Sequence, residues 1–267
     1  MFKSKTKFIN FNPQITNSAS NSYFLDNSDS FFEGLRIGKN NLESCTYTKI
    51  LHLKRNSNFS FLINQCQLLA GYGLVSKVSS NSIPLSPEMG GWQAIVDQIH
   101  NDTMLGLEQP YGIGLYVYVN SKFRGQGIAG KIIQSMKKYC LNSGIHTLYI
   151  PLLLPSSKSE KHFDQNIEDY FDLKREDGQY QDFWLRLHVK NGAKIIRTDQ
   201  RSHRFCVDQR LLNNSYYSQV GIEVNKKGSD YHIKSQSNNY LFKHMHGSDI
   251  YICNVPCVWV KYDINQI

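Results

Sequence analysis

Apolar residues follow two spacings along this chain, one typical of β-strands and one typical of α-helices. Between about 46 and 85, the runs TYTKILHL, FSFLINQ and LLAGYGLVSKV are rich in β-branched and aromatic residues and predict strands. The segment GGWQAIVDQIHND that follows has helical periodicity instead. Its apolar residues are Trp92, Ile95, Val96 and Ile99. We therefore expect an amphipathic helix here.

The middle of the chain predicts a strand, a glycine-rich loop and a helix in direct succession. Ile113 to Val119 is a continuous apolar run of the kind found in buried strands. The helix after the loop has one apolar face, made by Ile128, Ile132, Ile133, Met136 and Cys140. A second buried strand, IHTLYIPLLLP, ends at Pro155.

The last third predicts one more helix and further strands. A polar span from 156 to about 181 is expected to form a lid-like loop or short helix. Asp182 stands at an N-cap position before FWLRLHVK, and Asn191-Gly192 closes that helix. AKIIRT, RFCV and YICNVPCVWVKYD read as strands. The order of elements predicts a mixed α/β fold around one sheet.

Composition narrows the protein class. The 267 residues are 40% hydrophobic and 12% aromatic, which predicts a folded globular protein. The net charge of +8 is spread along the chain, so it indicates a solvated basic surface or an anionic ligand, and no nucleic-acid partner. No apolar run approaches the ~20 residues of a membrane span, and the start lacks an apolar signal core. We expect a cytoplasmic protein with no membrane partner.

The cysteines and histidines predict neither disulfides nor a metal site. The six cysteines show no C-x-x-C pair, so we expect reduced, mostly buried thiols. The run HMHGSDIYICNVPC holds two His and two Cys, but its spacing matches no standard set of zinc ligands.

The stretch FRGQGIAGKII fits three phosphate-binding motifs at once. Gly125, Gly127 and Gly130 spell G-x-G-x-x-G, and Gly125 to Lys131 spell G-x-x-x-x-G-K. A triphosphate loop needs Ser or Thr after the lysine, where this chain has Ile132. A dinucleotide site needs a carboxylate about 20 positions on, and none follows until Glu160. Both alternatives are disfavoured, and a plain glycine-rich turn stays open.

The third motif is Arg-x-x-Gly-x-Ala, made by Arg124, Gly127 and Ala129 directly after LYVYV. With the later WLRLHVKNGAKIIR, it resembles the GNAT superfamily of acyl-coenzyme-A N-acyltransferases over about 66–205. The resemblance implies a mainly antiparallel, splayed central sheet flanked by helices. It also implies an N-terminal extension (1–45), an acyltransferase core (46–210) and a C-terminal β-rich segment packing on the core (211–267).

The same resemblance implies acetyl-CoA or another acyl-CoA as the co-substrate, with no metal. Backbone groups in the strand would pair with pantetheine, and the loop would hold the pyrophosphate with help from the Arg124 side chain. The implied coenzyme-binding residues are Val117, Tyr118, Val119, Arg124, Gly125, Gln126, Gly127, Ile128, Ala129 and Gly130. The side chains of Ile128 and Ile132 are expected in the core.

The implied reaction moves an acyl group from the thioester to an amine of a small molecule or peptide. His188 occupies the slot where the family commonly has an acidic Tyr, so we expect it to be catalytic, with a structural histidine as the alternative. The run DGQYQDFWLRLHVKNGAKII also resembles GNAT-like domains of polyketide loading modules, where Ser156 would match a functional Thr. Those domains are associated with decarboxylation and acyl transfer to an acyl carrier protein. A non-catalytic acyl-CoA-binding module is a third possibility.

Overall fold

The computed structural model describes residues 7–11, 58–63, 69–86, 91–153, 167–213, 223–234 and 239–264. The predicted strand TYTKILHL and Ser156 lie outside these ranges. The predicted division of the chain at 45 and 210 stays a prediction.

A ten-stranded sheet organises the described chain, in the order β1-β2-β3-β4-β5-β10-β9-β8-β7, and β6 also pairs with β10. The strands are β1 (Lys7–Phe11), β2 (Asn58–Ile63), β3 (Leu69–Val78), β4 (Tyr111–Val119), β5 (Thr147–Leu153), β6 (Lys194–Asp208), β7 (Glu223–Lys227), β8 (Asp230–Lys234), β9 (Asn239–His244) and β10 (Ile250–Asp263). Only the β4–β5 contact is parallel among these pairs. The predicted mainly antiparallel sheet is confirmed.

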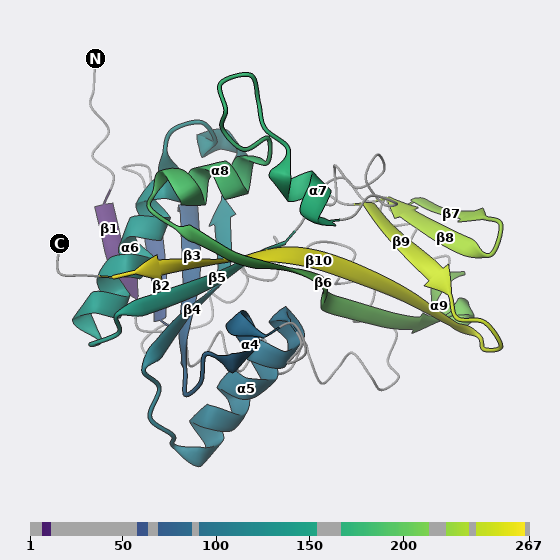
Figure 1. Cartoon of the computed structure of the whole chain (residues 1–267), viewed down its shortest axis with the longest axis horizontal. Helices are drawn as coiled ribbons and strands as arrows, with labels where there is room; N and C mark the ends of the chain where they lie inside the picture. Colours follow the sequence, from purple (N-terminus) through teal and green to yellow (C-terminus); the bar gives the residue numbers. More distant parts are fainter. Residues whose placement is uncertain are drawn as a thin grey trace.

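Helices cover both faces of the sheet (Figure 1). They are α4 (Ser82–Leu85), α5 (Trp92–Leu105), the 3-10 turn η3 (Ser121–Phe123), α6 (Ile128–Asn142), α7 (Ile167–Asp172), α8 (Phe183–Lys190) and α9 (Gln209–Leu212). Buried residues of α6, α7 and α8 form one core cluster with the sheet. Buried residues of α5 form a second cluster with Leu74, Ile113 and Trp259. The glycine-rich loop 124–127 precedes α6, on the first of these faces.

The parallel contact between β4 and β5 is short. It pairs Gly112 with Leu148 and Ile113 with Tyr149, and goes no further. Beyond this point β4 stays paired with β3 up to Val119, and β5 stays paired with β10 up to Leu153. A β-bulge coincides with the separation, because Leu74 and Val75 of β3 face Tyr116 and Gly114 and leave Leu115 as an extra residue. Bulges bend and twist a strand, so this one favours the divergence of β4 from β5.

The helix α6 forms where the apolar spacing predicts it. Its buried residues are Ile128, Ile132, Ile133, Met136 and Cys140, as expected from the sequence. Burying each such side chain is worth about 1.5–3 kcal/mol, so this face fixes α6 against the sheet. The start of α6 is thereby held at the end of β4.

The C-terminal strand β10 is central to the sheet. Its residues Cys257–Asp263 pair with β5, and its other edge pairs with β6. The two predicted strands AKIIRT and RFCV are parts of the single strand β6. The strands β7, β8 and β9 were not predicted individually, although they lie within the segment 211–267 that was expected to be β-rich, and they share a small core of their own with the outer ends of β6 and β10.

Within the described ranges, the longest apolar helices fall short of the ~20 residues that a bilayer span requires, since α6 has 15 residues.

Candidate functional site

The loop between β4 and α6 has the geometry of an anion-binding helix start. Gly125 and Gly127 both have positive φ, at 77° and 74°, and Gly127 is the N-cap of α6. The first bond of the helix is donated by the Lys131 N–H to the Gly127 carbonyl at 3.2 Å. The N–H groups of Ile128, Ala129 and Gly130 therefore precede the intrahelical ladder and can bind an anion.

The predicted loop residues, which are consecutive in the sequence, differ in their exposure. Arg124, Gly125, Gln126 and Gly127 are exposed, and Ala129 and Gly130 are half-buried. The Ile128 side chain is buried in the core, so only its backbone can reach a ligand. The loop therefore exposes its backbone to solvent, while the buried Ile128 side chain holds it against the core.

The predicted pantetheine-binding segment lies on the diverging half of β4. Val117 and Val119 pack partly against the α6 cluster, and Tyr118 packs against the α5 cluster. The β4 backbone at these positions is not hydrogen-bonded to β5, because the two strands have already separated. The diverging half of β4 ends at Val119 and leads through η3 to the start of α6.

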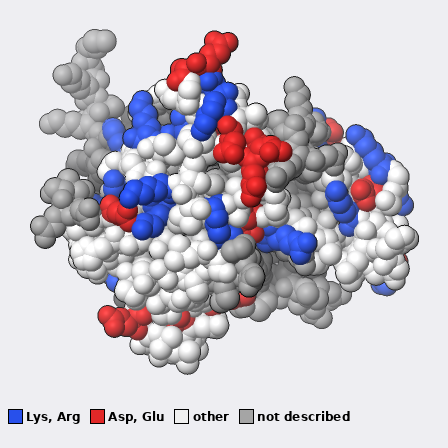
Figure 2. All heavy atoms as spheres, in the orientation of Figure 1, with Lys and Arg blue, Asp and Glu red and all other residues white. Residues whose placement is uncertain are grey.

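Basic and acidic side chains occupy different parts of the face that α6, α7 and α8 cover. Figure 2 shows basic side chains in the upper left, over α6 and α8, and acidic side chains at the upper centre, over α7. The exposed acidic residues of α7 are Glu168, Asp169 and Asp172. Exposed basic residues at the loop and the start of α6 are Lys122, Arg124 and Lys131.

The predicted N-cap of α8 is confirmed. Asp182 accepts the Leu185 N–H at 2.8 Å, and it also accepts the Tyr170 hydroxyl at 3.0 Å. Both side chains are buried, and their contact ties α7 to the start of α8. Burial and the neighbouring Asp182 carboxylate raise the pKa of Tyr170 above its usual range, so its hydroxyl stays protonated.

His188 lies on the inward face of α8 and is only 1% exposed. Its Nδ1 is 2.8 Å from the Tyr262 hydroxyl, which belongs to β10. Trp184 precedes it by one helical turn, with ring centres 6.4 Å apart. Burial lowers the pKa of His188 to about 4, so the imidazole is neutral near pH 7.

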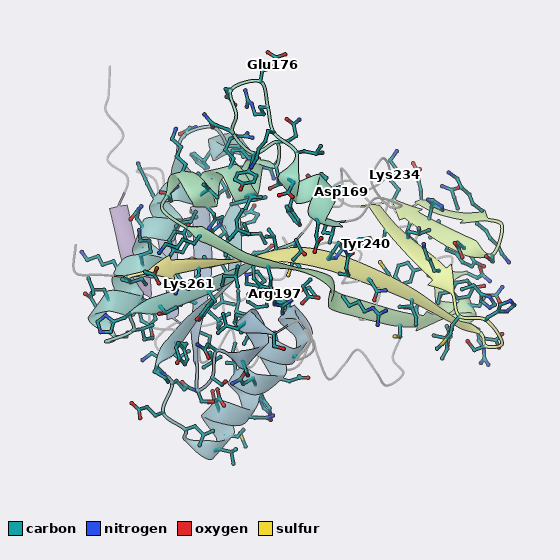
Figure 3. All side chains as sticks on the ribbon, in the orientation of Figure 1. Asp169, Glu176, Arg197, Lys234, Tyr240 and Lys261 are labelled. Atoms are coloured by element: carbon teal, nitrogen blue, oxygen red, sulfur yellow. The ribbon has the colours of Figure 1, made fainter. Side chains whose placement is uncertain are left out.

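A short hairpin separates α7 from α8. Lys174 and Tyr180 form its β-bridge, and Gly178 turns the chain with φ 75°. Figure 3 shows Glu176 at its tip, above α8 and directed away from the sheet. The polar span predicted as a lid-like loop or short helix thus includes α7 and this hairpin.

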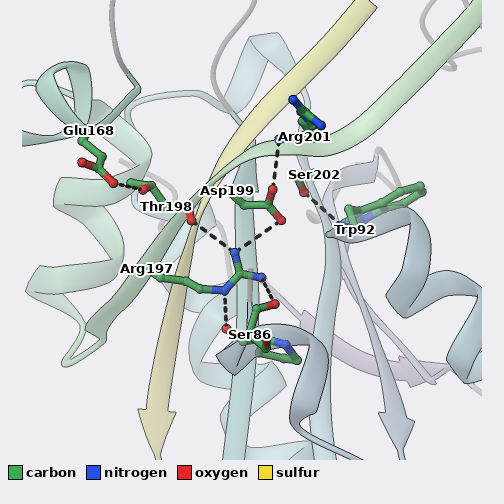
Figure 4. A network of polar contacts seen from close by, with 9 residues as sticks. Ser86, Trp92, Glu168, Arg197, Thr198, Asp199, Arg201 and Ser202 are labelled. Carbon is green, nitrogen blue, oxygen red and sulfur yellow. Dashed lines mark hydrogen bonds and ion pairs between the residues drawn. The ribbon is translucent and has the colours of Figure 1, made fainter. Parts of the chain in front are cut away.

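The opposite face holds a polar network that the sequence did not predict (Figure 4). Arg197 of β6 donates to the carbonyl oxygens of Pro84 and Ser86, both at 3.0 Å, and its Nη1 lies 3.5 Å from Asp199 Oδ2. Ser202 accepts the Trp92 N–H at 3.0 Å. These contacts fasten α4 and the start of α5 to β6.

The remaining candidates do not form a site within the described residues. His244 lies on β9 with its Nε2 2.7 Å from the Ser248 carbonyl, while burial raises the pKa of the Cys253 and Cys257 thiols to about 12. The described cysteines are all free thiols. No group of three or more His, Cys, Asp or Glu in the described ranges could hold a metal ion. Ser156 lies outside those ranges.

Tyr262, the contact of His188, was not predicted from the sequence. The two residues are 74 positions apart, and their contact depends on β10 entering the sheet beside β5. The only available signal was the position of Tyr262 in a β-rich segment, which is equally typical of an ordinary core tyrosine.

Known proteins resemble this chain in both sequence and fold. Residues 43–163 match the acetyltransferase (GNAT) family. Arginine N-acetyltransferase avaD of Aspergillus versicolor is 32% identical over 135 residues, which are 46% of this chain and 46% of that protein. The chain thus spans about half the length of this curated relative.

A solved structure resembles nearly the whole chain. The loading GNATL domain of CurA from Lyngbya majuscula has a TM-score of 0.50 and 12% identity, over 97% of this chain and 98% of that one. This likeness concerns the overall fold alone. Residues 43–163 therefore resemble the acetyltransferase (GNAT) family in sequence, and the whole chain resembles that loading domain in fold.

Proposed function

We propose that this protein is an acyl-CoA-dependent N-acyltransferase, with acetyl-CoA as the donor. The observation that carries the proposal is the separation of β4 from β5 after Ile113 and Tyr149, with the diverging half of β4 leading to the glycine-led start of α6. A gap between diverging strands suits an extended pantetheine arm, and a helix start suits the pyrophosphate.

The coenzyme would be held mainly by backbone groups. The amides of pantetheine would pair with β4 at Val117, Tyr118 and Val119, as a strand pairs with a sheet edge. The pyrophosphate would accept hydrogen bonds from the first N–H groups of α6 and from the loop Gly125–Gly127. The Arg124 guanidinium, which is exposed beside this loop, would add a charged contact.

The chemistry would be a direct displacement at the thioester. The amine lone pair attacks the acyl carbon, an N–C bond forms, the C–S bond breaks, and coenzyme A leaves as a thiolate. The amine loses one proton and the thiolate gains one, so the reaction needs no further reactant. His188 would contribute to this step as a neutral ring, because its low pKa excludes an imidazolium near pH 7.

Arginine is the first acceptor to test, since the relative from Aspergillus versicolor is named as an arginine N-acetyltransferase. The exposed carboxylates of α7 favour a cationic acceptor, because they create a negative potential on the same face of the sheet as α6 and its loop. A small-molecule amine with a second positive charge fits this division of charge.

Binding of acetyl-CoA to the purified chain, measured by calorimetry, tests the coenzyme assignment. Gly127→Ala forces a side chain into the left-handed region, which costs about 1–2 kcal/mol, so we expect about tenfold weaker binding. Gly106→Ala is the matched control, because Gly106 has φ 63° and caps α5 far from the loop. Unchanged binding by Gly127→Ala would refute the assignment of the loop.

Turnover separates the remaining possibilities. Release of free coenzyme A with arginine or another amine supports the N-acyltransferase. Carbon dioxide release from malonyl-CoA, with transfer to a carrier-protein thiol, would favour the loading-domain activity in which Ser156 would act with His188. Binding of acetyl-CoA without turnover across a broad amine panel would leave a non-catalytic binding module.

A further inference from the structure

The pair His188 and Tyr262 lies beside the point where β4 and β5 separate. Tyr262 is opposite Leu148 of β5, and Leu148 is opposite Gly112 of β4. Gly112, Leu148 and Tyr262 thus lie in one row across the sheet. The next pair, Ile113 and Tyr149, is the last paired position of β4 and β5. Neighbouring strands are about 4.8 Å apart, so Tyr262 is one strand spacing from β5. The pair is therefore close to the deep end of the gap.

The hydrogen bonds around this pair select one tautomer of His188. The Tyr262 hydroxyl has one proton and two acceptors, His188 Nδ1 at 2.8 Å and the His188 carbonyl oxygen at 3.3 Å. That carbonyl already accepts the N–H groups of Asn191 and Ala193, each at 3.0 Å, which use its two lone pairs. The hydroxyl proton therefore goes to Nδ1, at the shorter distance. A neutral imidazole that accepts at Nδ1 carries its own proton on Nε2.

The surroundings keep both partners in these forms. Burial lowers the pKa of His188 to about 4 and raises that of Tyr262, so near pH 7 the ring is neutral and the hydroxyl is protonated. Lys137 of α6 faces the Tyr262 ring with its Nζ 5.2 Å from the ring centre, so the Tyr262 ring is held between α6 and His188. The imidazole ring is thus fixed as an uncharged donor.

Nε2 is available for a further contact. The structure gives His188 Nε2 no hydrogen-bond partner within the described ranges. Nε2 is also absent from the polar atoms there that are both fully buried and without a hydrogen bond, so a small part of this atom is accessible. Because Nδ1 is occupied by Tyr262, any ligand of this ring must meet Nε2–H.

We propose that Tyr262 is a positioning residue that fixes His188 in the Nε2–H tautomer, so that the neutral ring donates a hydrogen bond to the acyl carbonyl oxygen of the thioester. This role rests on the proposed acyl transfer. It involves no proton transfer from the imidazole: the donor stabilises the negative charge that develops on oxygen when the amine attacks. The amine proton and the thiolate are balanced separately, through solvent.

Nitrogen-15 NMR of the imidazole rings tests the tautomer without any activity. A His188→Gln spectrum assigns the signals of His188 among the 9 histidines. We expect the Nε2–H pattern in the wild-type protein, unchanged between pH 8 and pH 6. An Nδ1–H pattern, or titration near the ordinary histidine pKa, would overturn the proposal.

Tyr262→Phe tests the positioning role. Without the hydroxyl, Nδ1 loses its donor, and we expect a mixture of tautomers and about a tenfold fall in kcat with little change in the KM for acetyl-CoA. The control is Tyr231→Phe, which removes a hydroxyl bonded to Asn213 at 2.9 Å in the C-terminal strands. We expect wild-type tautomer and rate for that variant.

The two outcomes of Tyr262→Phe separate positioning from simple stability. A lower unfolding temperature with the Nε2–H pattern and kcat unchanged would show a structural tyrosine and overturn the proposal. If no acyl donor supports turnover by the wild-type chain, the proposed function fails, while the NMR pattern still decides the tautomer.

Discussion

The Tyr170 hydroxyl donates a 3.0 Å hydrogen bond to the Asp182 carboxylate, and this buried contact joins α7 to the start of α8. Asp182 also caps α8 through the Leu185 N–H. Asp182→Ala removes the cap, worth about 1 kcal/mol, and also removes the charged acceptor of the Tyr170 hydroxyl, a hydrogen bond worth about 1.5–3 kcal/mol. We therefore expect a loss of about 2–4 kcal/mol in the free energy of unfolding, measured by urea denaturation.

Asp177→Ala is the control for that variant. Asp177 is exposed on the hairpin, where it pairs with Arg175 at 3.6 Å, so its loss should change stability by less than about 1 kcal/mol. Equal effects of the two substitutions would contradict the structural role given to Asp182.

The local signals in the sequence predicted the parts of the site that depend on neighbours in the chain. The spacing of Ile128, Ile132 and Met136 fixed the inner face of α6, and Asp182 marked the start of α8. The positive φ of Gly125 and Gly127 agrees with the loop that their spacing indicated. Each of these features is decided within one or two helical turns.

Contacts between residues far apart in the sequence, and strands at the edge of the sheet, were not predicted, for a physical reason. The partner of His188 is Tyr262, and this contact exists because β10 inserts between β5 and β6. The sequence of β7 has no recognisable strand pattern, since most of its side chains are exposed and only Val224 packs inward. A strand at the edge of a sheet carries too few apolar residues to be recognised from periodicity.

His188 should make the stability of the fold depend on pH. In the unfolded chain its pKa is the ordinary value near 6.5, and burial lowers it to about 4 in the fold. The unfolded state therefore binds the proton first as the pH falls below about 6.5, and the loss of stability continues down to about pH 4. Above about pH 7.5 the contribution is constant, because His188 is then neutral in both states.

The measurement is urea denaturation at pH 7 and pH 5. From these pKa values, the contribution of His188 to the free energy of unfolding should be about 2 kcal/mol smaller at pH 5 than at pH 7. His188→Gln should show that much less loss over the same interval. An identical pH dependence in the variant would mean that His188 titrates normally in the folded protein.

The start of α5 should be intolerant of any side chain at Gly91. A Cβ there would overlap the backbone of Ser202 and come within 2.6 Å of Asp199 Oδ2. The backbone of β6 cannot move aside, because Arg197 and Ser202 hold it against α4 and α5. We expect Gly91→Ala to destabilise the protein by about 3 kcal/mol, the upper range for overpacking, in thermal or urea unfolding.

Gly130 supplies the contrasting variant. A Cβ at Gly130 would meet its nearest neighbour, Asn191, only at 4.0 Å, and the residue lies within α6. Gly130→Ala should therefore leave stability unchanged or raise it by up to about 1 kcal/mol. A Gly91→Ala protein as stable as wild type would show that β6 and α5 are not locked together.

The Arg124 side chain should contribute a measurable, salt-sensitive part of acetyl-CoA binding. It is exposed directly before the glycine loop, where a pyrophosphate on the α6 helix start would be in reach. A charge-assisted hydrogen bond is worth about 1.5–3 kcal/mol, so Arg124→Gln should weaken binding by about tenfold or more at low ionic strength. Added salt should narrow the difference in affinity between Arg124→Gln and wild type, because it screens exposed charges.

Arg175→Gln is the control, since it removes one positive charge on the hairpin. This variant should bind acetyl-CoA as wild type does. Calorimetric titrations at two salt concentrations measure both variants. Equal affinities for Arg124→Gln and wild type at low salt would mean that the backbone alone holds the phosphates, and equal losses in both variants would mean that only the net charge of the surface matters.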